Sequence, residues 1–197
     1  MFGPIINGER IRLEPPRPEH AAVFIRWFAQ PELTNYMILR NPPSLRQEEE
    51  WLERMAASEH DVVWAISVRD TGMLIGITGL HRIDWRHRHA HSGIIIGEPT
   101  QWGKGYASEA MRLRTAYAFR ELGLEKVLSS VAVGNVASRR ALERAGYRQC
   151  GLLRRNRFFN GQWHDEWLGE VLREEWEAGQ QGQQPRLEPR GEPIDEA

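Results

Sequence analysis

A glycine-bearing loop at 102–107 carries the clearest chemical signal in the sequence. It reads Trp-Gly-Lys-Gly-Tyr-Ala and lies between an apolar segment and a segment with helical periodicity. Glycines let backbone N–H groups approach a ligand closely, and the unpaired amides at a helix N-terminus attract phosphate. The loop therefore predicts a phosphate-binding site. On its own it would fit a tight strand-to-helix turn equally well, and Lys104 suits solvent as well as a phosphate.

A second informative segment, 133–147, begins with Val-Gly-Asn and ends with Gly146 and Tyr147. Its Asn135 is well placed to cap a helix, a role that alone would explain it. The loop at 102–107 matches neither a Walker A loop nor the G-x-G-x-x-G fingerprint, which disfavours a nucleoside triphosphate or a dinucleotide as the ligand. The pair of segments is more informative than either one alone.

Periodicity and punctuation predict the elements that would position these segments. Before the loop we expect strands at 9–14, 62–68, 73–80 and 90–97, and helices at 19–28 and 44–57. Ser44 and Gln47 have the spacing of a capping box at the second helix. The strands 62–68 and 73–80 should form a hairpin, and the apolar run at 94–96 predicts a central strand buried on both faces.

After the loop the pattern alternates between helix and strand. We expect helices at 105–122 and 137–145, ended by Gly123 and Gly146, and strands at 127–133, 147–153 and 167–172. Asn160-Gly161 is a strong signal for a two-residue hairpin turn. The sequence thus predicts one domain, 1–178, with a mixed sheet and β-α-β units in its second half. The polar stretch 179–197 is expected to be a tail without a core of its own.

Together the two segments resemble the acetyl-CoA-binding motifs of the GNAT superfamily of acetyltransferases. The loop is similar to the family's Q/R-x-x-G-x-G/A pattern, and the start of 135–145 is similar to its N-x-x-S helix. Segments 9–13 and 158–165 extend the resemblance over most of the chain, toward the RimJ/RimL-like branch of ribosomal-protein acetyltransferases. The resemblance implies an α/β GNAT fold, with a mixed, mostly antiparallel central sheet of about six or seven strands, splayed in the middle and flanked by about four helices.

The resemblance also implies acetyl-CoA as the cosubstrate. Its pantetheine arm would enter a V-shaped opening between the strands that end near Gly97 and Val133 and bind there like an added strand. Asn135 would bond this arm, and Ser138 would lie near the thioester sulfur. Trp102 stands where the family usually has Gln or Arg, without threat to cofactor binding. The residues implied in cofactor binding are Ile95, Ile96, Gly97, Trp102, Gly103, Lys104, Gly105, Tyr106, Ala107, Asn135 and Ser138.

The expected reaction is direct attack of an amine on the thioester, so Cys150 is expected to be a packed side chain and not a nucleophile. Leu142 stands where many family members have a tyrosine acid, which leaves Ser138 or water to protonate the thiolate. Family similarity places an N–H that stabilises the oxyanion near Ile95. The amine must also lose a proton. His81, His91 and Glu98, with Asp84 nearby, are the candidate bases, and the sequence does not choose among them.

The acceptor is less determined than the cosubstrate. We expect a primary amine, in the first place a protein or peptide N-terminal amine, with a polyamine or an aminoglycoside as the alternative of the same chemistry. A noncatalytic acyl-CoA-binding module is the alternative of another class, because the usual tyrosine is absent. The net charge of -1, and the acidic residues between the arginines, argue against nucleic acid as a partner.

The remaining expectations concern location and assembly. The chain of 197 residues has one cysteine, no signal-like start and no apolar stretch near the ~20 residues that cross a bilayer, so we expect a cytoplasmic protein without membrane contact. No metal is expected, because arginines alternate with His87, His89 and His91 and no acidic or cysteine partner completes a site. Similar proteins commonly pair two subunits across the late strands, so a homodimer is one expectation.

Overall fold

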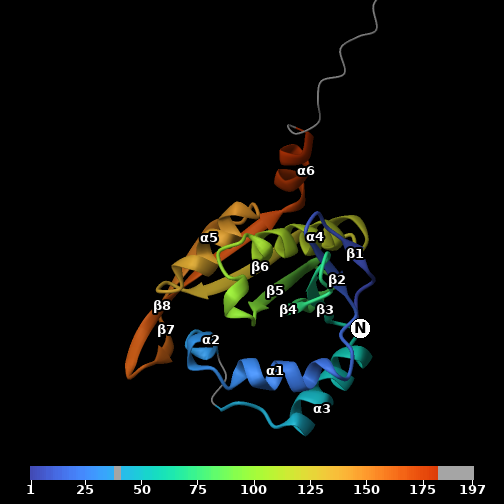
Figure 1. The fold of residues 1–197 in the computed structure, drawn as a ribbon. Helices are drawn as coiled ribbons and strands as arrows, with labels where there is room; N and C mark the ends of the chain where they lie inside the picture. Colours follow the sequence, from blue (N-terminus) through green and yellow to red (C-terminus); the bar gives the residue numbers. More distant parts are fainter. Residues whose placement is uncertain (38–40, 182–197) are drawn as a thin grey trace, which may run out of the picture.

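One mixed sheet runs through the chain, and helices cover both of its faces (Figure 1). The computed structural model describes residues 1–37 and 41–181. Neighbouring strands are antiparallel except for β5 and β6, and their order across the sheet is β1-β2-β3-β4-β5-β6-β8-β7. The strands are β1 (Ile6–Asn7), β2 (Ile11–Glu14), β3 (Val62–Val68), β4 (Leu74–Asp84), β5 (His89–Ile96), β6 (Lys126–Ala132), β7 (Arg148–Phe159) and β8 (Gln162–Leu172).

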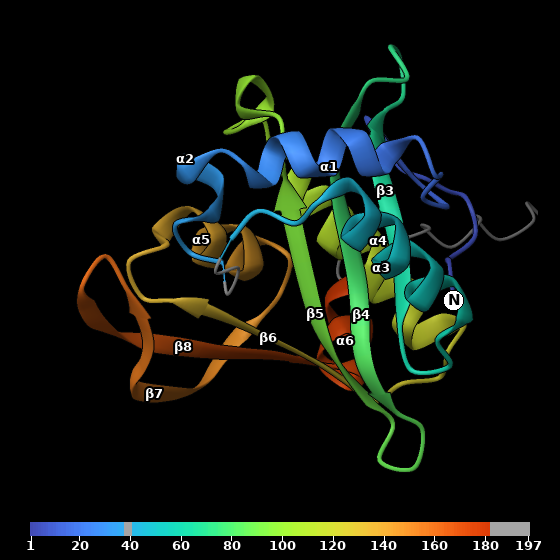
Figure 2. The same ribbon diagram turned by 90° about the horizontal axis from the view of Figure 1, so that it is seen from below.

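The helices divide between the two faces of the sheet. Helices α1 and α3 lie on one face and α4 and α5 on the other, whereas α6 follows β8 and leads away from the sheet (Figures 1 and 2). Two short elements, α2 and the 3-10 turn η1, follow α1 and β5. The helical elements are α1 (His20–Phe28), α2 (Pro31–Thr34), α3 (Leu45–Ala57), η1 (Pro99–Gln101), α4 (Tyr106–Arg120), α5 (Val136–Arg144) and α6 (Arg173–Gln181).

Each face of the sheet has its own apolar core. The larger core packs α4 and α5 against the sheet and includes Trp64, Phe119 and Trp167, each at most 1% exposed. The smaller core packs α1 and α3 on the opposite face through side chains such as Phe24 and Leu52. Burial of one such side chain contributes about 1.5–3 kcal/mol, so both helical layers are held mainly by these contacts. The two layers leave β4 and β5 between them, at the centre of the molecule.

Two local predictions are confirmed by side-chain and backbone geometry. At the start of α3 the Ser44 hydroxyl accepts from the Gln47 N–H at 3.3 Å, and Gln47 Oε1 accepts from the Ser44 N–H at 2.9 Å. This reciprocal pair is the predicted capping box. Asn160 and Gly161 have φ of 51° and 72°, the positive values of a two-residue turn that joins β7 to β8.

The structure adds to the predicted elements in several places. The sheet has eight strands, because the short β1 pairs with β2 at one edge. Both strands of the β7–β8 hairpin are longer than predicted. Helix α6 runs through Gln181, past the predicted start of the tail, and 182–197 lie outside the described residues. The residues at 94–96 are half-buried, not buried on both faces, because β6 diverges from β5 beside them.

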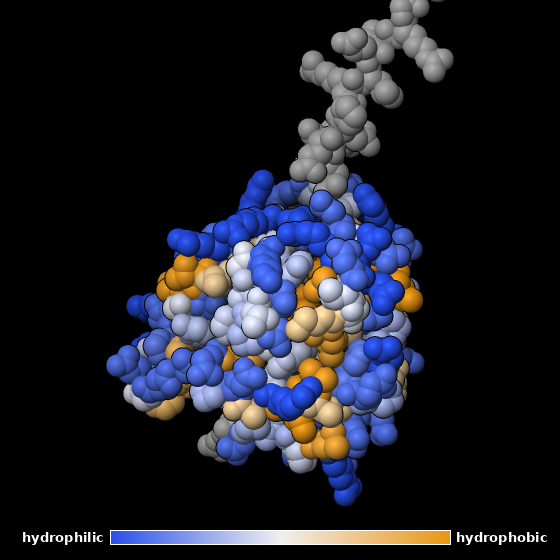
Figure 3. Space-filling view, viewed as in Figure 1, coloured by the Kyte–Doolittle hydropathy of each residue, from blue (hydrophilic) through white to orange (hydrophobic). Residues whose placement is uncertain are grey.

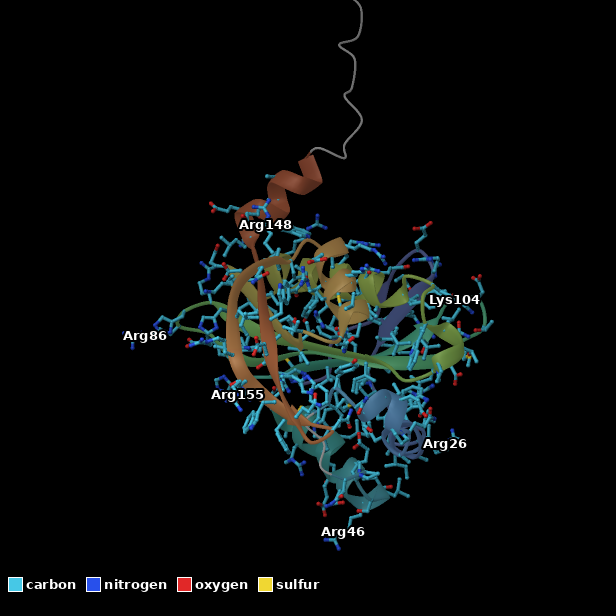
Figure 4. All side chains as sticks on the ribbon, turned by 90° about the vertical axis from the view of Figure 1, so that its left-hand side faces the viewer. Arg26, Arg46, Arg86, Lys104, Arg148 and Arg155 are labelled. Carbon is cyan, nitrogen blue, oxygen red and sulfur yellow. The ribbon has the colours of Figure 1, made fainter. Side chains whose placement is uncertain are left out.

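The surface shows how charged and apolar groups are distributed. The face seen in Figure 3 is largely hydrophilic, with apolar residues gathered in patches. The labelled basic side chains in Figure 4 lie at separate places around the molecule and do not gather on one face. None of the helices in the described ranges is long and apolar enough to cross a membrane. Four exposed apolar side chains lie on the β7–β8 hairpin: Leu152, Leu153, Phe158 and Trp163. A homodimer that pairs two subunits across this region stays a prediction.

Candidate active site

The two central strands, β5 and β6, pair over a short stretch and then diverge (Figure 2). Their parallel pairing joins 89–91 to 126–128. Beyond it, β5 continues to Ile96 and β6 to Ala132, and the Ser129 hydroxyl still reaches the carbonyl oxygen of Ser92 at 3.3 Å. The predicted splay in the middle of the sheet is therefore confirmed.

Backbone alternation decides which groups of β5 face this opening. The N–H of Gly97 donates to a β4 carbonyl at 2.8 Å. In an antiparallel ladder with this register, Ile95 also bonds β4, whereas Ile94 and Ile96 face the other way. The carbonyl of Ile96 agrees, because it accepts from Trp102 Nε1 at 2.8 Å on the side of the opening. The backbone N–H groups of Ile94 and Ile96 are thus presented to a ligand.

The loop at 102–107 leaves backbone donors uncommitted at the N-terminus of α4. Gly103 and Gly105 have φ of 75° and 82°, left-handed values that favour glycine. Among the described residues, no group accepts from the backbone N–H groups of 103–105. The first N–H groups of a helix also lack a partner within it. These amides, at the positive end of the α4 dipole, fit the phosphates of a nucleotide-containing ligand.

Arg10, just before β2, contacts this loop from the edge of the sheet that β1 and β2 form. Its Nη1 donates to the Lys104 carbonyl at 2.8 Å, and its guanidinium lies 5.3 Å from the centre of the Tyr106 ring. Its Nε pairs at 3.0 Å with Glu109, a carboxylate 5% exposed that also accepts from the Arg10 N–H. Lys104 Nζ donates to Gln101 Oε1 at 3.0 Å. The loop is therefore held in shape by contacts of the protein itself.

Asn135 and Ser138 lie at the start of α5, across the opening from β5. Asn135 Oδ1 accepts from the Ser138 N–H at 3.1 Å, so Asn135 is the helix cap that its residue type predicts. The Ser138 hydroxyl is half-buried, and no described residue hydrogen-bonds to it. Leu142 is 1% exposed and belongs to the larger core. Ser138 is thus the hydroxyl that α5 offers to the opening.

These elements together enclose a groove of about 640 Å³. Its walls come from β5, the loop at 102–107, the start of α4, the end of β6 and the start of α5. Unpaired amides lie at one end, and the parted strands supply backbone N–H groups along the other. This arrangement fits acetyl-CoA, whose pyrophosphate needs donors and whose pantetheine arm bonds to a strand edge.

A second cavity, of about 870 Å³, lies on the opposite face of β5, beside α1 and α3, and is called the acceptor cavity below. Gly79 and Gly93 pair directly within it, and the space left by their missing side chains is taken up partly by His81. The His81 Nε2 lies 2.7 Å from the point where a Cβ on Gly79 would be. Ile94 and Ile95 line both the acceptor cavity and the groove, so the two spaces meet at β5.

His81 is held in the acceptor cavity by a carboxylate at the start of β3. Its Nδ1 lies 3.0 Å from Asp61 Oδ1, and Asp61 also accepts from the Ser58 hydroxyl at 2.7 Å. Burial lowers the pKa of His81, although Asp61 works against this effect. Burial opposes ionisation of Asp61, but hydrogen bonds from Ser58 and His81 outweigh it and lower its pKa. The imidazole is therefore neutral at neutral pH, and the contact with Asp61 assigns its proton to Nδ1, leaving Nε2 as an acceptor.

Comparison with known families decides the class of enzyme. The model of the acetyltransferase (GNAT) domain matches residues 10–148. The chain belongs to the GNAT acetyltransferase family. It is accordingly an N-acetyltransferase that uses acetyl-CoA, and the noncatalytic module is disfavoured.

Individual relatives of this GNAT enzyme agree with the assignment. The chain is 33% identical over 168 residues to the uncharacterized N-acetyltransferase YoaA of Bacillus subtilis, covering 84% of this chain and 94% of that protein. It is 39% identical over 107 residues to the putative ribosomal N-acetyltransferase YdaF of the same species, covering 54% and 58%. The solved spermidine N-acetyltransferase of Vibrio cholerae, in complex with CoA and spermine, shares the fold with a TM-score of 0.79, at 23% identity and coverage of 86% and 99%.

The candidate bases of this GNAT enzyme lie in different places. His91 pairs with His81 across β4 and β5 but is exposed, and burial and the Arg82 charge lower its pKa. Glu98 follows the far end of β5, where its carboxylate accepts from the Thr100 hydroxyl at 2.9 Å and caps η1. Glu98 is not among the residues that line the groove or the acceptor cavity. The structure thus places only His81 of these three against the acceptor cavity.

Sequence reasoning missed Glu48, on α3. Its carboxyl is 5% exposed and lines the acceptor cavity, and burial raises its pKa to about 7. One signal was available, because Glu48 lies one helical turn before Leu52, on the apolar face of an amphipathic helix. A carboxyl on that face is expected to be buried.

Arg114, on α4, was also missed. It is fully buried beneath β4 and β5, where it donates to the Thr78 hydroxyl at 2.6 Å, the Gly93 carbonyl at 2.7 Å and the Tyr147 hydroxyl at 3.3 Å. No carboxylate in the described ranges pairs with it. Its charge adds to the lowering of the His81 pKa, after burial. Arg114 thus ties the backbone of β5 to α4 next to the acceptor cavity.

The histidine-rich turn between β4 and β5 does contain an acidic partner, contrary to the sequence prediction. Asp84 Oδ2 lies 2.9 Å from His87 Nδ1, and Asp84, His87 and His89 bring potential ligand atoms within 4.8 Å of one another. The prediction of no acidic partner is wrong because the turn folds Asp84 back onto the histidines. Asp84 also accepts from the His87 N–H at 2.8 Å, so these contacts are explained as those of a turn.

Proposed function

We propose that this enzyme acetylates the α-amino group of a protein or peptide N-terminus. The observation that supports this acceptor is the charge of the acceptor cavity. The charged or titratable side chains among its described lining residues are Glu48, Arg54 and His81, with a single carboxyl between them. A polyamine carries several ammonium groups and needs several carboxylates, whereas one α-amine needs one.

The neighbouring space supports the same choice. A cavity of about 1090 Å³ next to His81 is also lined by Arg82, His91, Arg157 and Glu166. Glu166 is paired with Arg157 and accepts from the Asn156 side chain, so its charge is already compensated. Among the described lining residues, neither cavity offers a polycation the array of free carboxylates that it would require.

The acidity of the acceptor matters as well. An α-amino group has a pKa near ~8, whereas the amines of lysine and polyamines have values near ~10. The pKa of His81 lies below its ordinary value, so the imidazole is a weak base. Proton transfer to it is less uphill from an α-ammonium group than from a polyamine. A histidine base of this kind suits an N-terminal amine.

The groups of the two spaces can be assigned to the steps of acetyl transfer. His81 Nε2 takes a proton from the acceptor ammonium group, and the neutral nitrogen attacks the thioester carbonyl carbon. The N–H groups of Ile94 and Ile96 both face the groove, and one of them stabilises the oxyanion, in the role first expected near Ile95, while the other is left for the pantetheine arm. The C–S bond then breaks, and the proton that the attacking nitrogen still carries in excess passes to the thiolate through the Ser138 hydroxyl or through water.

A polyamine is the second candidate acceptor. The spermidine N-acetyltransferase of Vibrio cholerae, which binds CoA and spermine, has the same fold. The RimJ/RimL-like branch is supported instead by the similarity to the putative ribosomal N-acetyltransferase YdaF. The described lining residues of the acceptor cavity include a single carboxyl. YdaF is therefore a better guide to the acceptor of this enzyme than the spermidine N-acetyltransferase.

Thiol release from acetyl-CoA tests this proposal directly. The purified enzyme is incubated with acetyl-CoA and with a panel of N-terminal peptides, spermidine and an aminoglycoside. We expect turnover with peptides and none with the same peptides formylated at the N-terminus. Turnover with spermidine or the aminoglycoside, together with no reaction on any free peptide, would reject an α-amine as the acceptor.

A further inference from the structure

Glu48 is a buried carboxyl without a partner in the acceptor cavity. It is 5% exposed, and no described residue donates a hydrogen bond to it or forms an ion pair with it. An unpaired charge costs much more in such surroundings than in water. Burial accordingly raises its pKa to about 7, and the Arg54 charge offsets this in part. A carboxyl held in this state binds strongly to a cation that enters the cavity.

The rest of the acceptor cavity is mainly apolar. Phe28 from α1 and Trp51 from α3 contribute aromatic side chains, and Ile77 and Ile95 contribute aliphatic ones from β4 and β5. The cavity extends to Gly79 and Gly93, where the His81 ring takes up part of the space that their missing side chains leave. A ligand that fits these walls carries one positive charge beside a bulky apolar group.

We propose that the Glu48 carboxylate binds the ammonium group of the acceptor and that the apolar walls of the cavity select N-termini whose first residue is bulky and apolar. This inference rests on the proposed function and names the substrate class of the same site. The α-ammonium group and the first side chain leave the same Cα atom, so a charged group beside apolar walls matches their separation.

Two side chains of the cavity act on the acceptor amine in different ways. Glu48 recognises the charge of the incoming amine, and His81, held by Asp61, removes its proton. Loss of Glu48 therefore weakens binding of the amine, whereas loss of His81 slows the chemical step. In steady-state kinetics the first change appears in KM for the amine and the second in kcat.

Glu48→Gln tests the first part, with Glu53→Gln as its matched control. Glu53 is on the same helix but exposed. We expect E48Q to raise KM for the amine by about tenfold or more, the usual scale for a lost hydrogen bond to a charged group, with kcat and KM for acetyl-CoA changed less than about twofold. E53Q should match the wild type. An E48Q enzyme with an unchanged KM, or with a fall in kcat alone, would overturn the role of Glu48 in binding.

The conservative variant Glu48→Asp separates charge from shape. It keeps the carboxylate but shortens the side chain, so its KM for the amine should lie between those of the wild type and E48Q. Thermal unfolding of all three variants checks the fold. If E48D is no better than E48Q while both remain folded, the carboxylate does not bind the ammonium group.

Peptides that differ only in their first residue test the second part. We expect kcat/KM to be about tenfold higher for a first residue of Leu, Met or Phe than for Gly or Ser, the scale of one or two buried methylenes. Equal values would overturn the apolar selection. If spermidine were the acceptor, the proposed function would fail, and the Glu48 role would still be decided by the KM of E48Q for spermidine.

Discussion

The two halves of the proposed active site lie on opposite faces of β5 and are built in different ways. The groove that we assign to acetyl-CoA is made largely of backbone groups, namely the amides of the loop at 102–107 and those of Ile94 and Ile96. The acceptor cavity is made of side chains, and Glu48 from α3 and His81 from β4 are among its polar groups. A backbone site depends on the conformation of the chain and tolerates those side-chain changes that leave this conformation intact, whereas a side-chain site changes its specificity with one substitution. The enzyme can thus keep its cosubstrate while its acceptor changes.

The largest expected effect is on the chemical step at the acceptor cavity. His81→Ala should lower kcat by about a hundredfold to ten-thousandfold, the usual contribution of a general base, with little change in acetyl-CoA affinity. Because burial lowers the pKa of His81, the wild-type rate should fall only at pH values below the ordinary histidine range. That acid limb should vanish in H81A.

Asp61→Asn sharpens this result. Asp61 raises the His81 pKa against the effect of burial, so its loss should move the acid limb to still lower pH. If His91→Ala removed the acid limb and H81A kept it, the base would be assigned to the exposed histidine instead.

The second effect concerns stability and should also be confined to the acceptor cavity. The folded-state pKa of Glu48 is raised from 4.5 to about 7, so the folded protein binds a proton more tightly than the unfolded chain does. Stability should therefore fall as pH rises between these two values, by at most ~3 kcal/mol from this one group. Glu48→Gln should remove that loss and unfold at a higher temperature than the wild type at pH 8, but not at pH 5.

Chemical denaturation at both pH values measures this difference. The exposed Glu53→Gln variant supplies the baseline at each pH. Equal stabilities of E48Q and wild type at pH 8 would show that burial does not raise the pKa of the Glu48 carboxyl.

The third effect concerns the groove. Gly105→Ala places a Cβ on a residue with φ of 82°, where it would lie 3.2 Å from Arg10 Nη2. Left-handed strain of about 1–2 kcal/mol should weaken acetyl-CoA binding by roughly tenfold, because the loop amides move out of line. Gly72 has φ of 67° in the turn between β3 and β4, does not line the groove, and its Cβ would meet nothing within 4 Å.

Gly72→Ala is therefore the matched control for G105A. It carries the same kind of backbone strain and should lower the unfolding temperature without changing the acetyl-CoA dissociation constant. Calorimetry that gave the two variants the same acetyl-CoA affinity would contradict a phosphate site at the loop.

The smallest effect is expected at Ser138. A thiol leaving group has a pKa near ~8.5 and departs readily as a thiolate. Ser138→Ala should therefore lower kcat by less than about tenfold, below the usual contribution of a general acid, because water replaces the hydroxyl. A fall larger than this, with a loss of the alkaline limb of the pH profile, would make the serine the essential proton donor.

The same contrast explains what could be predicted from the sequence. The groove could be predicted from the sequence because Gly103, Gly105 and Asn135 have a fixed spacing around the starts of helices. Most strands and helices could be predicted from periodicity. The partnership of His81 with Asp61 depends on how β3 and β4 pair, which no spacing encodes. The position of Glu48 on the apolar face of α3 indicates a buried carboxyl, but the cavity that Glu48 lines depends on the packing of α3 against α1. The half-buried state of 94–96 likewise follows from the divergence of β6, a tertiary feature.

The most direct test of the central claim locates the acetyl group after reaction. A peptide with a free N-terminal Leu and an internal lysine is incubated with the enzyme and acetyl-CoA, and the product is sequenced by tandem mass spectrometry. We expect one acetyl group on the α-amine and none on the lysine, because the described lining of the acceptor cavity has one carboxyl, apolar walls and a weak histidine base. Acetylation of the lysine, or acetylation of spermidine in place of the peptide, would contradict it.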